Sequence, residues 1–143
     1  MAKVKPKNNV QLQKMHVAGK LAAETLDFIA PHVRPGATTQ ELDTLCHNFI
    51  TENNAIPAPL NYRGFPKSVC TSVNEVICHG IPSPKHVLQE GDIMNIDVTV
   101  IVDGFHGDTS RMFCVGNVSP ARQRLVDVTY EAMMRGINAV RSG

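Results

Sequence analysis

Two aspartates, Asp97 and Asp108, stand in two runs rich in β-branched residues, 93–102 and 105–115. The runs are separated only by the dipeptide Asp103-Gly104, which is a strong signal for a two-residue hairpin turn. Such a turn makes the two aspartates diagonal neighbours on one face of the sheet, because cross-strand partners share a face. The spacing therefore predicts two carboxylates that converge. A three-residue loop would instead place them on opposite faces.

Two carboxylates on one strand face need an explanation, because Asp is depleted in strands and close like charges destabilise each other. A divalent cation would neutralise the pair, and two such cations side by side are a common device for hydrolysing amides or phosphates. The alternative is a solvated strand face on which Asp108 lies near Arg111. The other face of the first run is expected to be core, with Met94, Ile96, Val98, Val100 and Val102.

His79 lies in the segment Cys-His-Gly-Ile-Pro, where Gly and Pro restrict the backbone. At a cleft, a neutral imidazole in this position could hydrogen-bond a scissile carbonyl or its amide nitrogen. A structural or merely exposed loop histidine is the alternative. His106 shares the predicted face of Asp108, but it stands nearer the turn, and we interpret it as a bystander.

The segment 55–67 combines several Pro and Gly residues with two aromatic residues and predicts an ordered loop. Within it, Pro59, Tyr62 and Phe65 could form the wall of an apolar side-chain pocket, although ordinary core packing explains them equally well. The chain has no GxSxG, P-loop, GxGxxG or HExxH motif for nucleophilic hydrolysis, nucleotide binding or a zincin site.

Three amphipathic helices would position this hairpin. In the first, apolar residues recur three or four apart from Val10 to about Pro31. The second begins at a capping-box signature formed by Thr38 and Glu41 and ends near Asn53. The third begins at Ser119 and Pro120 and runs almost to the last residue. Its expected inward face is Leu125, Val126, Met133, Ile137 and Val140. The combination predicts an α+β fold.

The composition bounds the class of protein. With 143 residues and a formal net charge of +1, the chain is long enough for one domain and carries no large field of one sign that would attract nucleic acid. We expect residues 1–9 to be a polar tail. No apolar stretch is long enough for a membrane span or a signal peptide, so the sequence predicts a cytoplasmic protein without a membrane partner.

Two strings, TSVNEVICHGIP at 71–82 and GDIMNIDVTVIVDGFHGDTSRMF at 91–113, are together highly specific. With them the chain resembles the type I methionine aminopeptidases of the pita-bread fold family, from its first predicted helix to its last residue. The resemblance implies the N-terminal half of that fold, an antiparallel sheet with helices packed on one face. It also implies removal of the initiator methionine from nascent proteins when the second residue is small.

In that family, catalysis uses two divalent cations, of Co, Mn, Fe or Zn, and a bridging water. The resemblance then implies that Asp97 binds one metal, that Asp108 bridges both, and that His79 contacts the substrate near the scissile bond. Pro59, Tyr62 and Phe65 would form the pocket for the methionine side chain. Some bacterial members carry Cys and Tyr in place of Pro59 and Phe65, which affects the fine shape of the pocket.

Family members continue beyond the region that this chain matches, with a His and two Glu that complete the ligand set and a second His that aids catalysis. We therefore expect 1–143 to be a single incomplete catalytic domain with weak metal binding and little or no activity by itself. Full-length members are monomeric, whereas this half fold is expected to dimerise or aggregate through its uncovered apolar surface. The alternative function is a non-catalytic half-fold module that docks a ribosome or a partner protein.

Overall fold

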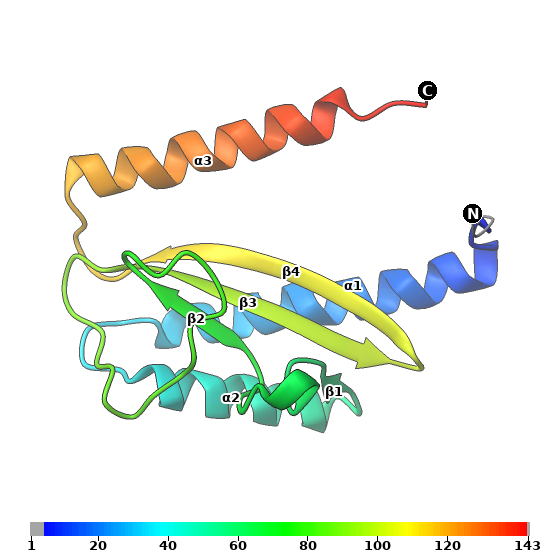
Figure 1. The fold of residues 1–143 in the computed structure, drawn as a ribbon, viewed down its shortest axis with the longest axis horizontal. Helices are drawn as coiled ribbons and strands as arrows, with labels where there is room; N and C mark the ends of the chain where they lie inside the picture. The colour runs from blue at the N-terminus through cyan, green and yellow to red at the C-terminus, as the bar shows by residue number, and fades with distance from the viewer. Residues whose placement is uncertain (1–4, 143) are drawn as a thin grey trace.

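The computed structural model describes residues 5–142, which form three α-helices and one antiparallel sheet, the α+β class that the sequence predicts. In Figure 1 the sheet lies between α3 and α2, and its strands cross in front of α1. No helix in the described part of the chain is long and apolar enough to cross a membrane. The elements are α1 (Asn9–Ile29), α2 (Thr39–Glu52), β1 (Ile56–Pro57), β2 (Cys70–Val73), β3 (Ile93–Val102), β4 (Phe105–Cys114) and α3 (Pro120–Ala139), with short 3₁₀ turns at Ala30–His32 and Tyr62–Gly64.

Strand β3 is the centre of the sheet, with β4 along one side and both β1 and β2 along the other. The predicted hairpin register is confirmed, since Val102 faces Phe105 at the turn. Asp103 and Gly104 have φ angles of 49° and 79°, and a two-residue type I′ turn requires positive φ at both positions. Strand β1 was not predicted, because it is only two residues long and contains a proline, which is tolerated at a sheet edge.

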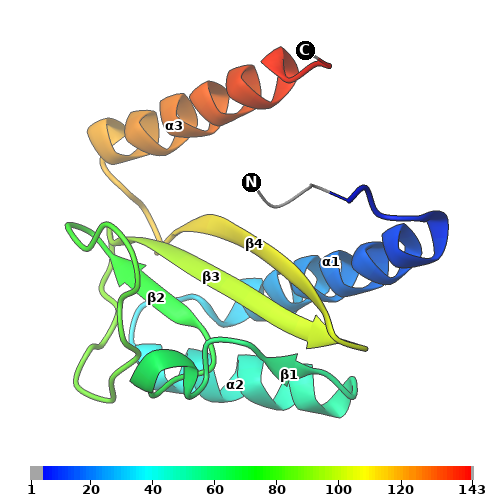
Figure 2. The same cartoon turned by 45° about the vertical axis from the view of Figure 1, so that its right-hand side comes forward.

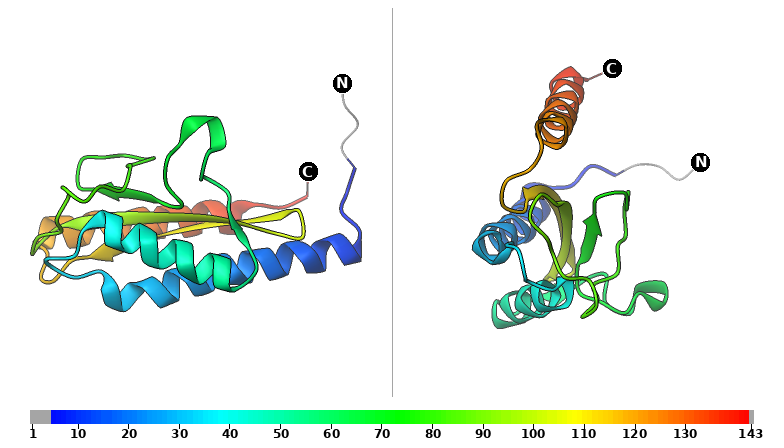
Figure 3. Two further views of the ribbon diagram at one scale, coloured as in Figure 1. Left: turned by 90° about the horizontal axis from the view of Figure 1, so that it is seen from below. Right: turned by 90° about the vertical axis from the view of Figure 1, so that its left-hand side faces the viewer.

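Helices α1 and α2 pack together on one face of the sheet (Figure 3). The predicted core side chains of β3, from Met94 to Val100 at every second position, are fully buried beneath them. Gly107 of β4 allows the closest approach, because a Cβ at this position would lie 2.1 Å from the carbonyl oxygen of Ala18 in α1. The side of the sheet that carries the two aspartates is thus backed by a tightly packed layer.

The helix starts follow from local capping. The predicted capping box of α2 is present, with the Glu41 amide donating to the Thr38 hydroxyl at 3.1 Å and the Thr38 amide to the Glu41 carboxylate at 2.8 Å. Helix α1 begins one residue before the predicted Val10, because Asn8 and Gln11 form a second capping box. Of the predicted polar tail 1–9, residues 1–4 lie outside the described part.

Helix α3 lies apart from α1 and α2 (Figure 2), and no residue in it is buried. Its first turn is anchored, because Arg122 donates to the Gly91 carbonyl and lies 3.8 Å from a carboxylate oxygen of Asp92. The face expected to point inward is instead exposed, with Met133 at 51% and Leu125 at 59%. The prediction that helices pack on one face of the sheet is therefore confirmed for α1 and α2. For α3, the sequence periodicity identified an apolar face but did not identify the surface that this face contacts.

Candidate functional site

Asp97 and Asp108 line one cleft of about 840 Å³ on the face of the sheet opposite α1 and α2. Asp97 faces Ser110 and Thr99 faces Asp108, so the predicted diagonal relationship between the carboxylates is confirmed. Burial raises the pKa of Asp97, the negative charge of Asp108 raises it further, and His79 acts in the opposite direction. The two carboxylates are thus close enough to repel each other.

The alternative explanation was a solvated strand face on which Asp108 lies near Arg111. The predicted proximity of Asp108 to Arg111 is wrong. Arg111 faces Ile96 across the hairpin and therefore belongs to the other face of the sheet. Its guanidinium lies 2.8 Å from the carboxylate of Asp27 in α1. In the described residues, Asp108 has no ion-pair partner.

His79 also lines the cleft, on a segment that is fixed to β2. The Thr71 amide donates to the Gly80 carbonyl at 2.8 Å, and the Gly80 amide donates to the Ser72 hydroxyl at 3.1 Å. A Cβ at residue 80 would lie 2.1 Å from the Thr71 carbonyl oxygen, so only glycine fits there. His79 itself has a φ of 55°, a left-handed conformation that is uncommon for a non-glycine residue. The surrounding structure holds this imidazole beside the carboxylates.

Pro59, Tyr62 and Phe65 lie together along the same cleft, on the loop that follows β1. The loop is joined to β3 by a hydrogen bond from the Ala58 amide to the Thr99 carbonyl at 2.9 Å. The alternative of ordinary core packing does not describe Tyr62, which is 64% exposed. The predicted apolar wall and the predicted acidic pair thus belong to one concave surface.

Sequence reasoning did not assign several other residues of this cleft, among them Arg63, Cys70 and Thr99. Cys70 faces Asp97 across the β2–β3 pairing. Burial, followed by the charge of Asp97, raises the pKa of the Cys70 thiol to about 11. His106, interpreted from the sequence as a bystander, is also part of the cleft lining. The 20 or so residues between β2 and β3 leave that register unspecified, so no local signal could have found Cys70.

Asp97 and Asp108 have the donor type that suits a divalent cation, because carboxylate oxygens are ligands for hard and borderline cations. Burial, followed by the negative charge of Asp108, raises the pKa of Asp97. The two side chains offer four oxygens and a combined charge of −2. Within residues 5–142, no third His, Cys, Asp or Glu joins them in a group that could hold a metal ion. The two carboxylates by themselves are fewer ligands than a divalent cation takes.

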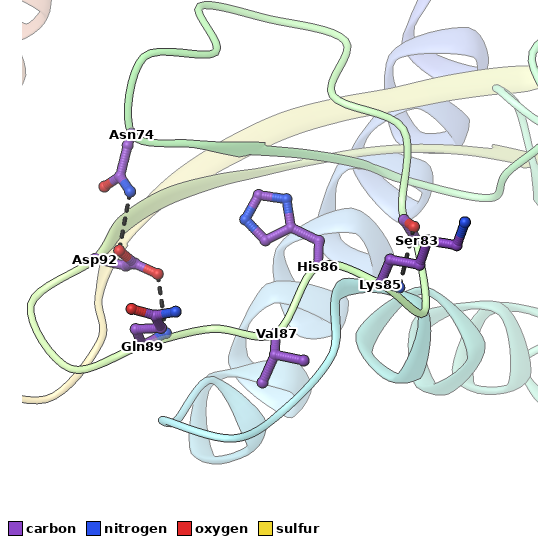
Figure 4. Close-up of a pocket in the computed structure, with 7 residues that line it drawn as sticks. All are labelled: Asn74, Ser83, Lys85, His86, Val87, Gln89 and Asp92. Carbon is purple, nitrogen blue, oxygen red and sulfur yellow. Dashed lines mark hydrogen bonds between the residues drawn. The ribbon is translucent and has the colours of Figure 1, made fainter.

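A second cavity, of about 570 Å³, lies beside the turn before β3 and contains none of the predicted site residues (Figure 4). Its polar groups are largely satisfied by one another. Asn74 donates to the Asp92 carboxylate at 2.9 Å, the Gln89 amide donates to the same carboxylate at 2.9 Å, and the Lys85 amide donates to the Ser83 hydroxyl at 3.2 Å. These contacts anchor the loops that lead into β3.

Comparison with known proteins gives a consistent assignment. The sequence profile of metallopeptidase family M24 matches residues 13–143. A methionine aminopeptidase from Rickettsia prowazekii is 67% identical over 130 residues, which are 91% of this chain and 50% of that protein. Methionine aminopeptidase A from Synechocystis is 57% identical over 133 residues, 93% of this chain and 53% of that protein. The chain thus spans about half the length of the curated relatives it matches.

Solved structures agree with the sequence comparisons. The crystal structure of methionine aminopeptidase from Rickettsia prowazekii superposes with a TM-score of 0.96 and 62% identity, over 99% of this chain and 56% of that chain. The Thermotoga maritima enzyme gives a TM-score of 0.94 at 31% identity, over 99% of this chain and 57% of that one. An Xaa-Pro dipeptidase from Bacillus anthracis, at 21% identity and a TM-score of 0.79, shares the fold over 96% of this chain and 37% of its own.

Proposed function

Because the chain belongs to metallopeptidase family M24, we propose that the protein is a metal-dependent aminopeptidase that removes the initiator methionine from nascent proteins when the second residue is small. The observation that carries this proposal is the single cleft that holds the acidic pair, His79 and the aromatic loop. The relatives named methionine aminopeptidase support the same reading. In this proposal the protein binds the N-terminus of a new polypeptide in the cytoplasm, near the ribosome.

In this proposal Asp97 and Asp108 hold two divalent cations of Co, Mn, Fe or Zn, which when bound supply a polarising charge and an activated water. His79 lies beside the acidic pair, where its imidazole can hydrogen-bond the reacting amide. Pro59, Tyr62 and Phe65 exclude water from around an apolar side chain and so favour methionine at the N-terminus.

For the 143 residues alone we propose weak metal binding and little or no turnover. Two carboxylates oppose the +4 charge of two cations with −2, and four oxygens are fewer than two cations need. Two cations therefore need ligands in addition to these two carboxylates.

Peptide binding tests the proposal independently of turnover. The purified chain with Mn²⁺ should bind Met-Ala-Ser more tightly than Lys-Ala-Ser in isothermal titration calorimetry, because the cleft wall is apolar. Tyr62→Ala should reduce this difference, whereas Tyr130→Ala, a change at an exposed tyrosine of α3, should leave it unchanged. Equal binding of both peptides would contradict a methionine pocket. Rapid methionine release by the chain would contradict the shortage of metal ligands.

A second candidate function is a non-catalytic module that docks a ribosome or a partner protein. The observation that favours it is the exposed apolar face of α3, which includes Leu125, Met133 and Ile137. Co-sedimentation with purified ribosomes distinguishes the two functions. A docking module should still sediment after Asp97→Ala and Asp108→Ala and should be released by Met133→Asp.

A further inference from the structure

The cleft is lined by side chains of opposite charge. Asp97 and Asp108 lie on the sheet, and Arg63 lies on the loop that carries the aromatic wall. Arg63 is the only Lys or Arg among the lining residues within the described chain. In the proposed function the acidic pair is occupied by metal, so Arg63 is the charged group of the cleft that remains for an anionic group on the ligand.

The backbone holds Arg63 in an unusual conformation. Its φ is 48°, and the flanking Asn61 and Gly64 also have positive φ, at 66° and 85°. Loop hydrogen bonds maintain this shape, with the Asn61 amide donating to the Phe65 carbonyl at 2.8 Å. A left-handed conformation costs a non-glycine residue about 1 kcal/mol or more, so the loop fixes where this side chain leaves the backbone.

The guanidinium of Arg63 is also partly oriented. Its central carbon lies 5.5 Å from the centre of the Tyr62 ring. Stacking on an aromatic ring uses the face of a guanidinium and leaves the N–H groups along its edge able to donate. Within residues 5–142, Arg63 makes no ion pair and donates no side-chain hydrogen bond to protein. These donors are free to bind a ligand.

We propose that Arg63 is a specificity-determining residue that binds a carboxylate on the substrate, at a position after the second residue of the peptide. This inference rests on the proposed function, in which the N-terminal residue occupies the space between Asp97 and Tyr62. The proposed function requires a small second residue, so an acidic side chain near Arg63 has to come from a later position of the peptide. Arg binds carboxylates through two parallel hydrogen bonds, which makes an acidic residue the matching group.

The opposing explanation is that Arg63 only covers the ring of Tyr62 and has no ligand. Substitution by a neutral residue of similar length separates the two explanations. If the side chain only packs, Arg63→Gln should change the affinity for all peptides equally. If it binds a carboxylate, the change should be confined to acidic peptides.

The experiment compares two amidated peptides, Met-Ala-Asp-Asp-Ala and Met-Ala-Asn-Asn-Ala, by isothermal titration calorimetry of the 143-residue chain in the presence of Mn²⁺. The wild-type chain should bind the acidic peptide about 5- to 10-fold more tightly, as expected for a partly exposed charge-assisted pair. Arg63→Gln should bring the two affinities within about twofold by weakening only the acidic peptide. Arg124→Gln, a change at an exposed arginine of α3, should retain the preference.

Equal affinity of the wild-type chain for the two peptides would overturn this inference and leave the proposed function intact. A preference that persists in Arg63→Gln would also overturn it, because the acidic peptide would then be binding through the added metal or another group. Failure of both peptides to bind would overturn the proposed function, and this inference with it.

Discussion

Replacing Asp97 by Asn should stabilise the metal-free chain, although the same change removes a proposed metal ligand. Asp97 and Asp108 are diagonal neighbours on one face of the β3–β4 hairpin. For charges about 7 Å apart, as for diagonal neighbours in a hairpin, and an effective dielectric constant between roughly 20 and 40, the repulsion is about 1 to 2 kcal/mol. Because Asp97 is half exposed, the low end of this range is appropriate. For a domain of this size, about 1 kcal/mol corresponds to a rise in Tm of roughly 2 to 4 °C.

The pH dependence has a definite sign. Burial and the charge of Asp108 raise the pKa of Asp97 above its value in the unfolded chain. Between the unfolded and the folded pKa, the folded state holds more protons, so the free energy of unfolding falls as the pH rises through this window. Asp97→Asn should remove that decrease. The stabilisation by the substitution should therefore be largest above the folded pKa and absent at lower pH.

Thermal unfolding followed by circular dichroism in EDTA, from pH 3 to pH 7.5, measures this effect. Glu75→Gln is the matched control, since it removes one negative charge at an exposed position. Adding Mn²⁺ should then reverse the order of stability. A cation at ten times its Kd stabilises the wild-type chain by about 1.4 kcal/mol and should not stabilise Asp97→Asn. A lower Tm for metal-free Asp97→Asn, or equal stabilisation of both proteins by Mn²⁺, would refute the reasoning.

Three further predictions concern the packing, the helix cap and the thiols. Gly107→Ala should destabilise the chain by about 3 kcal/mol or more in urea unfolding, because its Cβ would overlap a backbone carbonyl of α1. The control Gly136→Ala, in exposed α3, should be neutral or stabilising by up to about 1 kcal/mol. Similar effects at both sites would contradict the close approach of β4 to α1. Thr38→Ala should cost about 1 kcal/mol by removing the capping box of α2, and an unchanged unfolding midpoint would argue against it. Iodoacetamide at pH 8, followed by mass spectrometry, should modify exposed Cys78 well before Cys70, whose pKa is raised to about 11, and the reverse order would contradict the burial of Cys70.

The hairpin could be predicted in full from the sequence because its determinants are local. The dipeptide Asp103-Gly104 fixes the turn type, the turn fixes the register, and the register fixes which side chains share a face. The start of α2 is also determined by local contacts, because the side chains of Thr38 and Glu41 each accept a hydrogen bond from the other residue's backbone amide. Asp97 and Asp108 could therefore be placed together without knowledge of the rest of the fold.

Other features depend on contacts between distant segments, and the sequence alone did not reveal them. The pairing of β2 with β3 sets Cys70 opposite Asp97, but a long irregular connection joins these strands. The hydrogen bond from Ala58 to Thr99 brings the aromatic loop to the acidic pair. For α3, the apolar periodicity is clear, yet the helix buries none of its residues in the described chain. Local patterns define a face, whereas its partner depends on tertiary structure.

The central claim is that Asp97 and Asp108 share one of the two proposed cations, and a double-mutant cycle on Mn²⁺ binding tests it most directly. The EPR signal of free Mn²⁺ would be measured with the wild-type chain, Asp97→Asn, Asp108→Asn and the double variant. If the carboxylates share the cation, either single substitution should abolish most of the binding, and the second should add little. Independent, additive losses, or Mn²⁺ binding that survives in the double variant, would contradict the account.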